Sequence, residues 1–281
     1  MRIVSVFVSS LDHTSQMFDI RLVTIGDSFT EGMCDEFRAD GNYLGWADRL
    51  AKMLADQQGA PIGYANLAIR GKLLDQVVKD QIEAALALDP TIITFHAGPN
   101  DVLRRGTDLD DLFQRYDQAV QRLTAHESTT VVLFTAIGRA GGTGKVAQLL
   151  ADRFAKFNAN VRATAQKYGC VVVDLEPIDV LTDRRLWFED RLHLNAAGHS
   201  RVAAAAFDAI TRNTKTVSNA ETDQWWTRPL PPAPTRSKVQ DLKTDAMWVK
   251  NHMLPWVVRR MKGVSSGDGR HPKDSSLSVV R

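Results

Sequence analysis

Short apolar runs alternate with longer amphipathic segments over residues 20–212 of this chain. The apolar runs predict strands at 20–26, 61–68, 91–98, 130–138 and 170–175. Apolar residues at helical spacing predict helices at 43–58, 73–88, 108–125, 146–168 and 195–212. Five strands separated by helices indicate βαβ units, and therefore an α/β fold with a parallel sheet covered on both faces.

Polar residues follow the carboxyl ends of these strands. Ser28 comes directly after the first strand, Gly71 after the second and Asn100 after the third, while Asp190 and His193 precede the last helix. Ligand sites in open parallel sheets form beyond the carboxyl ends of the strands. The five residues are therefore expected at one rim of the sheet.

These residues include the parts of a nucleophilic site. Serine is a weak nucleophile and needs a base, and the base needs a partner that fixes its tautomer and stabilises its charged form. The D-x-x-H spacing of Asp190 and His193 lets one short loop supply both. The backbone N–H groups of Ser28 and Gly71, together with the Asn100 amide, offer three donors for an oxyanion hole.

The same four blocks, in this order, resemble the SGNH hydrolase superfamily, the GDSL-type esterases and lipases. The blocks are G-D-S at Ser28, Gly71, G-x-N-D at Asn100 and D-x-x-H at His193, and the first reads GDSF rather than GDSL. The resemblance covers roughly residues 20–212. It implies a flavodoxin-like three-layer α/β/α sandwich and hydrolysis of carboxylic esters without metal or cofactor.

The resemblance also implies the roles of the residues. Ser28 is expected to be the nucleophile, His193 the base and Asp190 its orienting partner. Ser28, Gly71 and Asn100 are expected to donate to the oxyanion. The G-x-S-x-G elbow of α/β-hydrolases is absent, and so is the G-x-G-x-x-G fingerprint of dinucleotide-binding domains.

Three polar residues near these blocks have simpler interpretations. Asp27 is expected to bond loop amides, and His96 is expected to be a buried histidine at a strand end. Cys34 is expected to be a small loop residue. The only other cysteine is Cys170, and neither lies in a CxxC pattern, so metal ligation by cysteine is not expected.

The chain is predicted to have four regions. Residues 1–18 are expected to be an N-terminal extension, 19–213 the hydrolase domain, 214–263 a Pro-rich connector with a basic amphipathic segment, and 264–281 a disordered basic tail. The basic segment 239–263 is expected to dock on the domain or to cover the cleft, and contact with an anionic membrane surface is the alternative.

Several partner classes have no support in the sequence. The basic tail is attached to an acidic body without a nucleic-acid-binding motif, so nucleic acid is not expected as a partner. No apolar run approaches the length of a membrane span, and no convincing signal peptide precedes the first strand. A cytoplasmic location is therefore expected, while the oligomeric state is not indicated.

The favoured function is that of a serine esterase acting on a small-molecule ester. Short-chain or acetyl esters are preferred, and a lysophospholipid substrate is left open. The same residues would also serve an acyltransferase, which passes the acyl group to an alcohol rather than to water. A ligand-binding module without catalysis is the third interpretation.

Overall fold

The computed structural model describes residues 18–138, 144–214, 223–233, 247–248, 250–251, 255 and 265–281. Nearly all of the expected N-terminal extension, 1–18, and much of the connector, 214–263, lie outside the described residues. No helix among the described residues is both long and apolar enough to cross a membrane.

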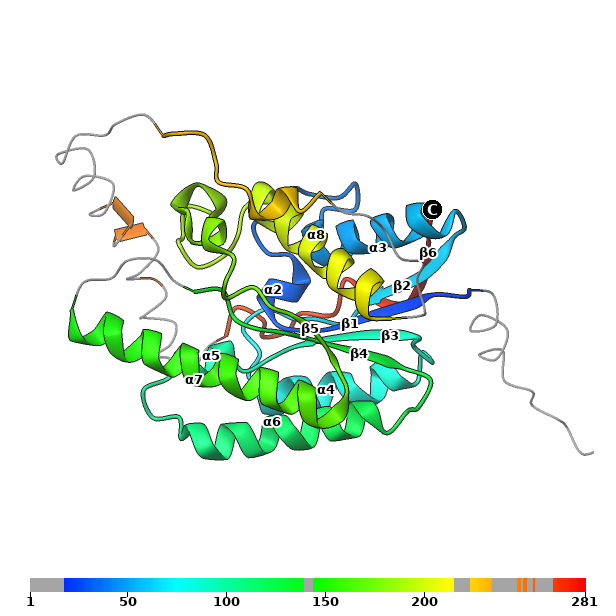
Figure 1. Ribbon diagram of the computed structural model, residues 1–281, viewed down its shortest axis with the longest axis horizontal. Coiled ribbons are helices and arrows are strands. Elements are labelled where there is room, and N and C mark those ends of the chain that lie inside the picture. Colours follow the sequence, from blue (N-terminus) through cyan, green and yellow to red (C-terminus); the bar gives the residue numbers. More distant parts are fainter. Residues whose placement is uncertain are drawn as a thin grey trace, which may run out of the picture.

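The centre of the molecule is one sheet with the strand order β5-β4-β3-β1-β2-β6 (Figure 1). Five neighbouring strands run parallel, as the βαβ pattern predicts. They are β1 (Arg21–Gly26), β2 (Ile62–Asn66), β3 (Ile92–His96), β4 (Thr130–Phe134) and β5 (Val171–Val173). Nearly every residue of these strands is buried, because helices cover both faces of the sheet.

A sixth strand, β6 (Asp274–Val280), pairs antiparallel with β2 at the edge of the sheet. The expectations of five strands and of a disordered tail at 264–281 are therefore wrong. The tail is poor in apolar residues, but an edge strand obtains its backbone hydrogen bonds from its neighbour and needs few apolar contacts. Leu277 packs against the core on one face of the sheet, and Val280 packs against the core on the other.

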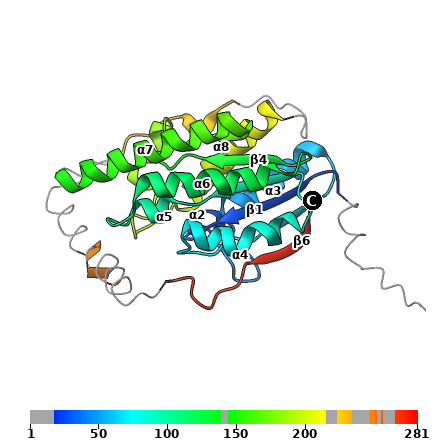
Figure 2. The same ribbon diagram turned by 90° about the horizontal axis from the view of Figure 1, so that it is seen from below.

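Helices cover both faces of the sheet, which confirms the three-layer α/β/α architecture. Helices α3 (Gly45–Gln58) and α8 (Ala196–Asn213) lie on one face (Figure 1). The other face carries α4 (Leu74–Leu86), α6 (Leu109–Thr124) and α7 (Lys145–Tyr168), which lie side by side in Figure 2. Short helices α2 (Ser28–Glu31) and α5 (Pro99–Val102) begin just after β1 and β3.

Alternate residues of each strand pack into two apolar cores, one on each face of the sheet. Leu22 and Ile92 pack with α3 and α8, whereas Val23 and Ile93 pack with α4, α6 and α7. This follows from the two-residue period of a strand. The helices contribute residues at helical spacing, and Trp46 of α3 is the largest fully buried side chain of the first core. The two cores hold the carboxyl ends of the strands at one rim.

Candidate active site

Ser28 is the first residue of α2, directly after the end of β1. The turn depends on Gly26, because a Cβ there would lie 2.4 Å from the His96 carbonyl oxygen, and its φ is +153°. Asp27 caps α2, and its Oδ1 accepts a hydrogen bond from the Phe29 N–H at 3.0 Å. The interpretation of Asp27 as a residue that bonds loop amides is thereby confirmed.

Ser28, His193 and Asp190 form one line of hydrogen bonds. The Ser28 Oγ lies 3.0 Å from the His193 Nε2, and the His193 Nδ1 lies 2.6 Å from the Asp190 Oδ2. The loop before α8 is folded back on itself, since the Phe188 N–H donates to the His193 carbonyl at 2.8 Å. The sequence predicted this meeting of a strand end with a loop 165 residues away.

The charge of Asp190 sets the direction of these bonds. Burial alone would raise the pKa of Asp190, but hydrogen bonds from the His193 ring and from the backbone N–H groups of His193 and Leu192 lower it to about 2. The carboxylate is therefore ionised at neutral pH and can only accept. The His193 Nδ1 then carries the proton, and its Nε2 presents a lone pair to the Ser28 hydroxyl.

Asn100 lies beside this line of bonds in α5. Its Nδ2 donates to the Asp27 Oδ2 at 3.0 Å and to the Lys72 carbonyl at 3.0 Å. Both hydrogens of the amide are thus engaged, so Asn100 must release or share one of them to donate to a substrate oxygen. The contact with Lys72 brings Asn100 next to Gly71, whose φ of +74° lies in the left-handed region.

An ion pair joins α2 to the loop that carries Gly71. The Arg70 backbone N–H donates to the Glu31 Oε2 at 2.6 Å, and the Arg70 guanidinium donates to both oxygens of the same carboxylate. The two side chains are only 12% and 13% exposed. The nucleophile's helix and the Gly71 loop are therefore fixed to each other.

A cavity of about 90 Å³ opens beside Ser28 and His193. Asp27, His96, Asn100, Thr135 and His199 contribute polar groups to it, whereas Gly71 is absent from its lining. Its apolar lining consists of Phe29, Met33, Pro99, Leu103, Ala136, Ile137, Phe154, Leu175, Trp187, Leu192 and Leu194. The site can therefore hold a small apolar group next to the serine hydroxyl.

Two histidines in the cavity wall are buried. His96 is 6% exposed at the end of β3, as expected from the sequence. Burial lowers the pKa of His199 to about 4, so this residue is neutral at neutral pH. Its Nδ1 accepts from the Trp46 N–H at 3.3 Å, and its Nε2 donates to the Met33 carbonyl at 3.2 Å.

Two further residues contact Asp190, and the sequence predicted this contact for neither of them. The Cys34 Sγ lies 3.8 Å from the Asp190 Oδ2, and burial together with the Asp190 charge raises the pKa of this thiol to about 12. The indole N–H of Trp248 donates to the Asp190 carbonyl at 2.9 Å, and the Arg191 guanidinium lies over its ring. Trp248 thus docks on the domain. No local sequence signal links either residue to Asp190.

Cys34, Asp190 and His193 each place a potential metal-ligand atom within 4.8 Å of the other two. The Asp190 carboxylate and the His193 ring already bond to each other, and the Cys34 thiol is protonated at neutral pH. A metal ion there would have to replace the bond between Asp190 and His193. The arrangement therefore suits proton transfer with Ser28 better than metal binding.

The family comparison agrees with this site. A model of the GDSL-like lipase/acylhydrolase family matches residues 24–201. This range contains the Ser28, Gly71, Asn100 and His193 blocks. The chain belongs to the GDSL-like lipase/acylhydrolase family, within the SGNH hydrolases. A search of curated protein sequences finds no match.

Solved structures show the same fold. TesA is 19% identical with a TM-score of 0.56, over 69% of this chain and 99% of TesA. The psychrotrophic esterase EstA from Pseudoalteromonas sp. is 16% identical with a TM-score of 0.53, and the match covers 68% of this chain and 97% of EstA. An acetyl xylan esterase from Geobacillus stearothermophilus is 20% identical with a TM-score of 0.53, and the match covers 72% of this chain and 100% of the esterase. Each neighbour is matched over nearly its whole length, so the additional residues belong to this chain.

Proposed function

We propose that this protein is a serine esterase that hydrolyses short-chain carboxylic esters through an acyl-enzyme on Ser28. The observation that carries the proposal is the line of hydrogen bonds from Ser28 through His193 to Asp190, which ends at a small apolar cavity. Membership of a lipase/acylhydrolase family supports ester hydrolysis as the reaction class.

In the proposed first step, the His193 Nε2 takes the proton of Ser28 while the Ser28 Oγ attacks the ester carbonyl carbon. Asp190 stabilises the imidazolium that forms. Backbone N–H groups of Ser28 and Gly71, with the Asn100 amide, would hold the oxyanion. The imidazolium then protonates the leaving alcohol, and the carbon–oxygen bond to that alcohol breaks.

In the second step, the His193 Nε2 takes a proton from water, which attacks the acyl-enzyme carbonyl. The acid leaves and the proton returns to Ser28, so the enzyme is regenerated. This step uses the same residues in the same roles, because the new tetrahedral intermediate carries its negative charge on the same oxygen.

The cavity supports a short acyl group as the preferred substrate feature. A space of about 90 Å³ between Phe29, Phe154 and the other apolar side chains suits an acetyl or butyryl group. Long acyl chains would have to extend beyond it into solvent. We therefore place this protein with acetyl and short-chain esterases rather than with lysophospholipases.

A series of p-nitrophenyl esters from acetate to palmitate tests the proposal, with wild type and Ser28→Ala measured in parallel. We expect turnover on acetate and butyrate that Ser28→Ala loses by at least about 10⁴-fold, while the variant remains folded by circular dichroism. Wild-type turnover in Ser28→Ala would overturn the mechanism. A preference for palmitate would overturn the assigned chain length, and product formation only with an added alcohol would indicate an acyltransferase.

A further inference from the structure

We propose that residues 265–281, here called the C-terminal brace, position the Gly71 loop and the α2 helix for catalysis. The brace includes β6 and lies beyond the family match, which ends at residue 201. The inference rests on the proposed function for its effect on turnover. The contacts of the brace with the two catalytic segments can be tested without any activity.

One end of the brace packs directly on the Gly71 loop. The Ser265 Oγ donates to the Gly71 carbonyl at 3.4 Å and accepts from the Gly267 N–H at 3.2 Å. A Cβ on Gly267 would lie 2.0 Å from the Arg70 carbonyl oxygen. The two backbones are therefore in contact, and there is no room for a side chain between them.

Gly71 is equally constrained from its own side. A Cβ on Gly71 would lie 2.4 Å from the Ser265 Oγ. The proposed oxyanion donor therefore lies against the brace, and the ion pair between Arg70 and Glu31 holds the other side of the loop to α2. A shift of the brace would move the loop relative to Ser28.

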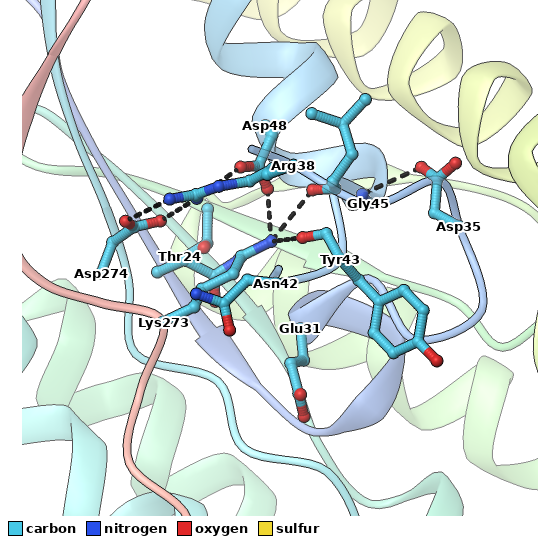
Figure 3. Close-up of polar contacts among 12 residues, drawn as sticks. Thr24, Glu31, Asp35, Arg38, Asn42, Tyr43, Gly45, Asp48, Lys273 and Asp274 are labelled. Carbon is cyan, nitrogen blue, oxygen red and sulfur yellow. Dashed lines mark hydrogen bonds and ion pairs between the residues drawn. The ribbon is translucent and has the colours of Figure 1, made fainter. Parts of the chain in front are cut away.

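The other end of the brace is anchored by Lys273, which is 3% exposed. Its Nζ donates to the Tyr43 carbonyl at 2.8 Å, the Leu44 carbonyl at 2.9 Å and the Asp48 Oδ2 at 2.5 Å (Figure 3). An ammonium group has three donors, and all three are used here. Lys273 thus fixes β6 to the loop before α3 and to the first turn of α3.

The next residue, Asp274, binds Arg38 through both carboxylate oxygens, at 2.6 and 3.0 Å (Figure 3). Arg38 also donates to the Asp48 Oδ1 at 3.0 Å. Two cations and two carboxylates therefore lie together beside the sheet, and Arg38 also donates to the more exposed Asp40 at 2.6 Å. Removing one charged side chain of this cluster leaves a poorly solvated charge without its partner, which lowers the free energy of unfolding.

A chain of hydrogen bonds leads from this cluster to the nucleophile's helix. The Tyr64 hydroxyl donates to Asp48 at 3.1 Å, and the Asn66 Nδ2 donates to the Tyr64 oxygen at 3.1 Å. The same Nδ2 donates to the carbonyl of Thr30 at 2.9 Å, two residues after Ser28. The brace is therefore bonded to α2 through β2, as well as to the Gly71 loop directly.

These contacts predict an effect on turnover rather than on substrate affinity. The brace touches the segments that would hold the nucleophile and the oxyanion, while none of its residues lines the cavity. Misplacement of catalytic groups by about 1 Å can reduce turnover by about 10²-fold. Loosening the brace should therefore lower kcat and leave KM nearly unchanged.

Gly267→Ala and Gly269→Ala are a matched pair for this test. The new Cβ at Gly267 would collide with the Arg70 carbonyl, whereas nothing lies within 4 Å of a Cβ at Gly269. Both lie in the same turn of the full-length chain, and the Gly269 φ of +72° makes its substitution strained as well. Ser265→Ala is a milder variant that removes only a hydroxyl.

With p-nitrophenyl acetate, we expect Gly267→Ala to lower kcat by about 10- to 100-fold. Its KM should stay within about 2-fold of wild type, and Gly269→Ala should keep the wild-type kcat. Ser265→Ala should lower kcat by about 2- to 5-fold, as expected for one weak hydrogen bond. A kcat of Gly267→Ala equal to that of Gly269→Ala would overturn the proposal.

Amide hydrogen exchange measures the same effect without turnover. The Ile69 and Arg70 N–H groups are bonded to the Gly26 carbonyl and to Glu31. Their exchange should accelerate in Gly267→Ala and stay as in wild type in Gly269→Ala. Unchanged exchange in Gly267→Ala would overturn the proposal that the brace positions the Gly71 loop, whatever the activity of this variant. Ester turnover that does not need Ser28 would overturn the proposed function and leave the exchange result standing.

Discussion

Two polar clusters at the sheet differ in what their hydrogen bonds leave open. In the cluster of Lys273, Asp48, Arg38 and Asp274, opposite charges neutralise one another, and the ammonium donates three bonds. The line from Ser28 to Asp190 instead ends at a hydroxyl that faces a cavity. The first arrangement holds a strand in place, and the second leaves an oxygen available for chemistry.

The carboxylates of the two clusters also differ. Burial raises the pKa of Asp48, although Lys273 and Arg38 act against it. Hydrogen bonds outweigh burial at Asp190 and lower its pKa to about 2. Asp190 is thus charged at neutral pH, which a partner for an imidazolium requires.

Asp190→Asn should give the largest effect, because it disrupts the line of hydrogen bonds from Ser28 to Asp190. An amide cannot stabilise the imidazolium and favours the wrong tautomer of His193, so kcat on p-nitrophenyl acetate should fall by about 10⁴-fold. A fall of less than about 10-fold would contradict the role of Asp190.

Lys273→Met should disrupt the cluster of Lys273, Asp48, Arg38 and Asp274 and lower the stability of the fold. The change removes one donor each from Asp48 and two backbone carbonyls. Arg38 and Tyr64 still donate to Asp48, but this buried carboxylate loses its ammonium partner, so the free energy of unfolding should fall by about 3–5 kcal/mol. Urea denaturation measures this. Lys52→Met is the control, because Lys52 is 57% exposed and its pair with Asp56 should contribute less than about 1 kcal/mol. Equal losses in the two variants would show that the buried cluster does not stabilise the fold.

Asn100→Ala separates a structural role from a catalytic one. Asn100 donates hydrogen bonds to Asp27 and Lys72, and it is also proposed to donate to the oxyanion. Its loss should lower kcat by about 10²–10³-fold, with little change in KM. Steady-state kinetics on p-nitrophenyl acetate measure this. A change in thermal stability with unaltered kcat would assign Asn100 to structure alone.

The smallest effect concerns His199, a buried neutral residue in the cavity wall. Its folded pKa of about 4 lies below the ordinary histidine value of 6.5, so the unfolded chain binds its proton first as the pH falls. This contribution to stability is complete above pH 6.5 and is lost progressively toward pH 4, by about 3 kcal/mol at most. In His199→Gln, the free energy of unfolding should depend less on pH over that window. An unchanged dependence would mean that His199 is not the group responsible.

The catalytic line could be predicted from sequence because its parts lie at the ends of regular elements. The apolar runs locate the strand ends, and parallel strands bring Ser28 and Asn100 to one rim. The pair of Asp190 and His193 is local, because the two residues are three positions apart. Strand and helix positions follow from periods of two and 3.6 residues, so those five strands and the helices between them were found.

The brace could not be predicted, because its bonds join residues more than 190 positions apart. Lys273 meets Asp48 across 225 residues, and Ser265 meets Gly71 across 194. Neither end carries a motif, and the Ser- and Lys-containing composition is typical of disorder. Whether such a segment pairs depends on the open edge of β2, which sequence periodicity does not reveal. The same reasoning applies to Cys34 and Trp248 beside Asp190.

The most direct test of the account is to trap the acyl-enzyme. Wild type and His193→Ala would be quenched with acid during turnover of p-nitrophenyl acetate, digested and analysed by mass spectrometry. We expect one acetyl group on Ser28 in wild type, and almost none in His193→Ala after the same time. Rapid turnover by wild type without acetyl on Ser28, or with the acetyl group on another residue, would contradict it.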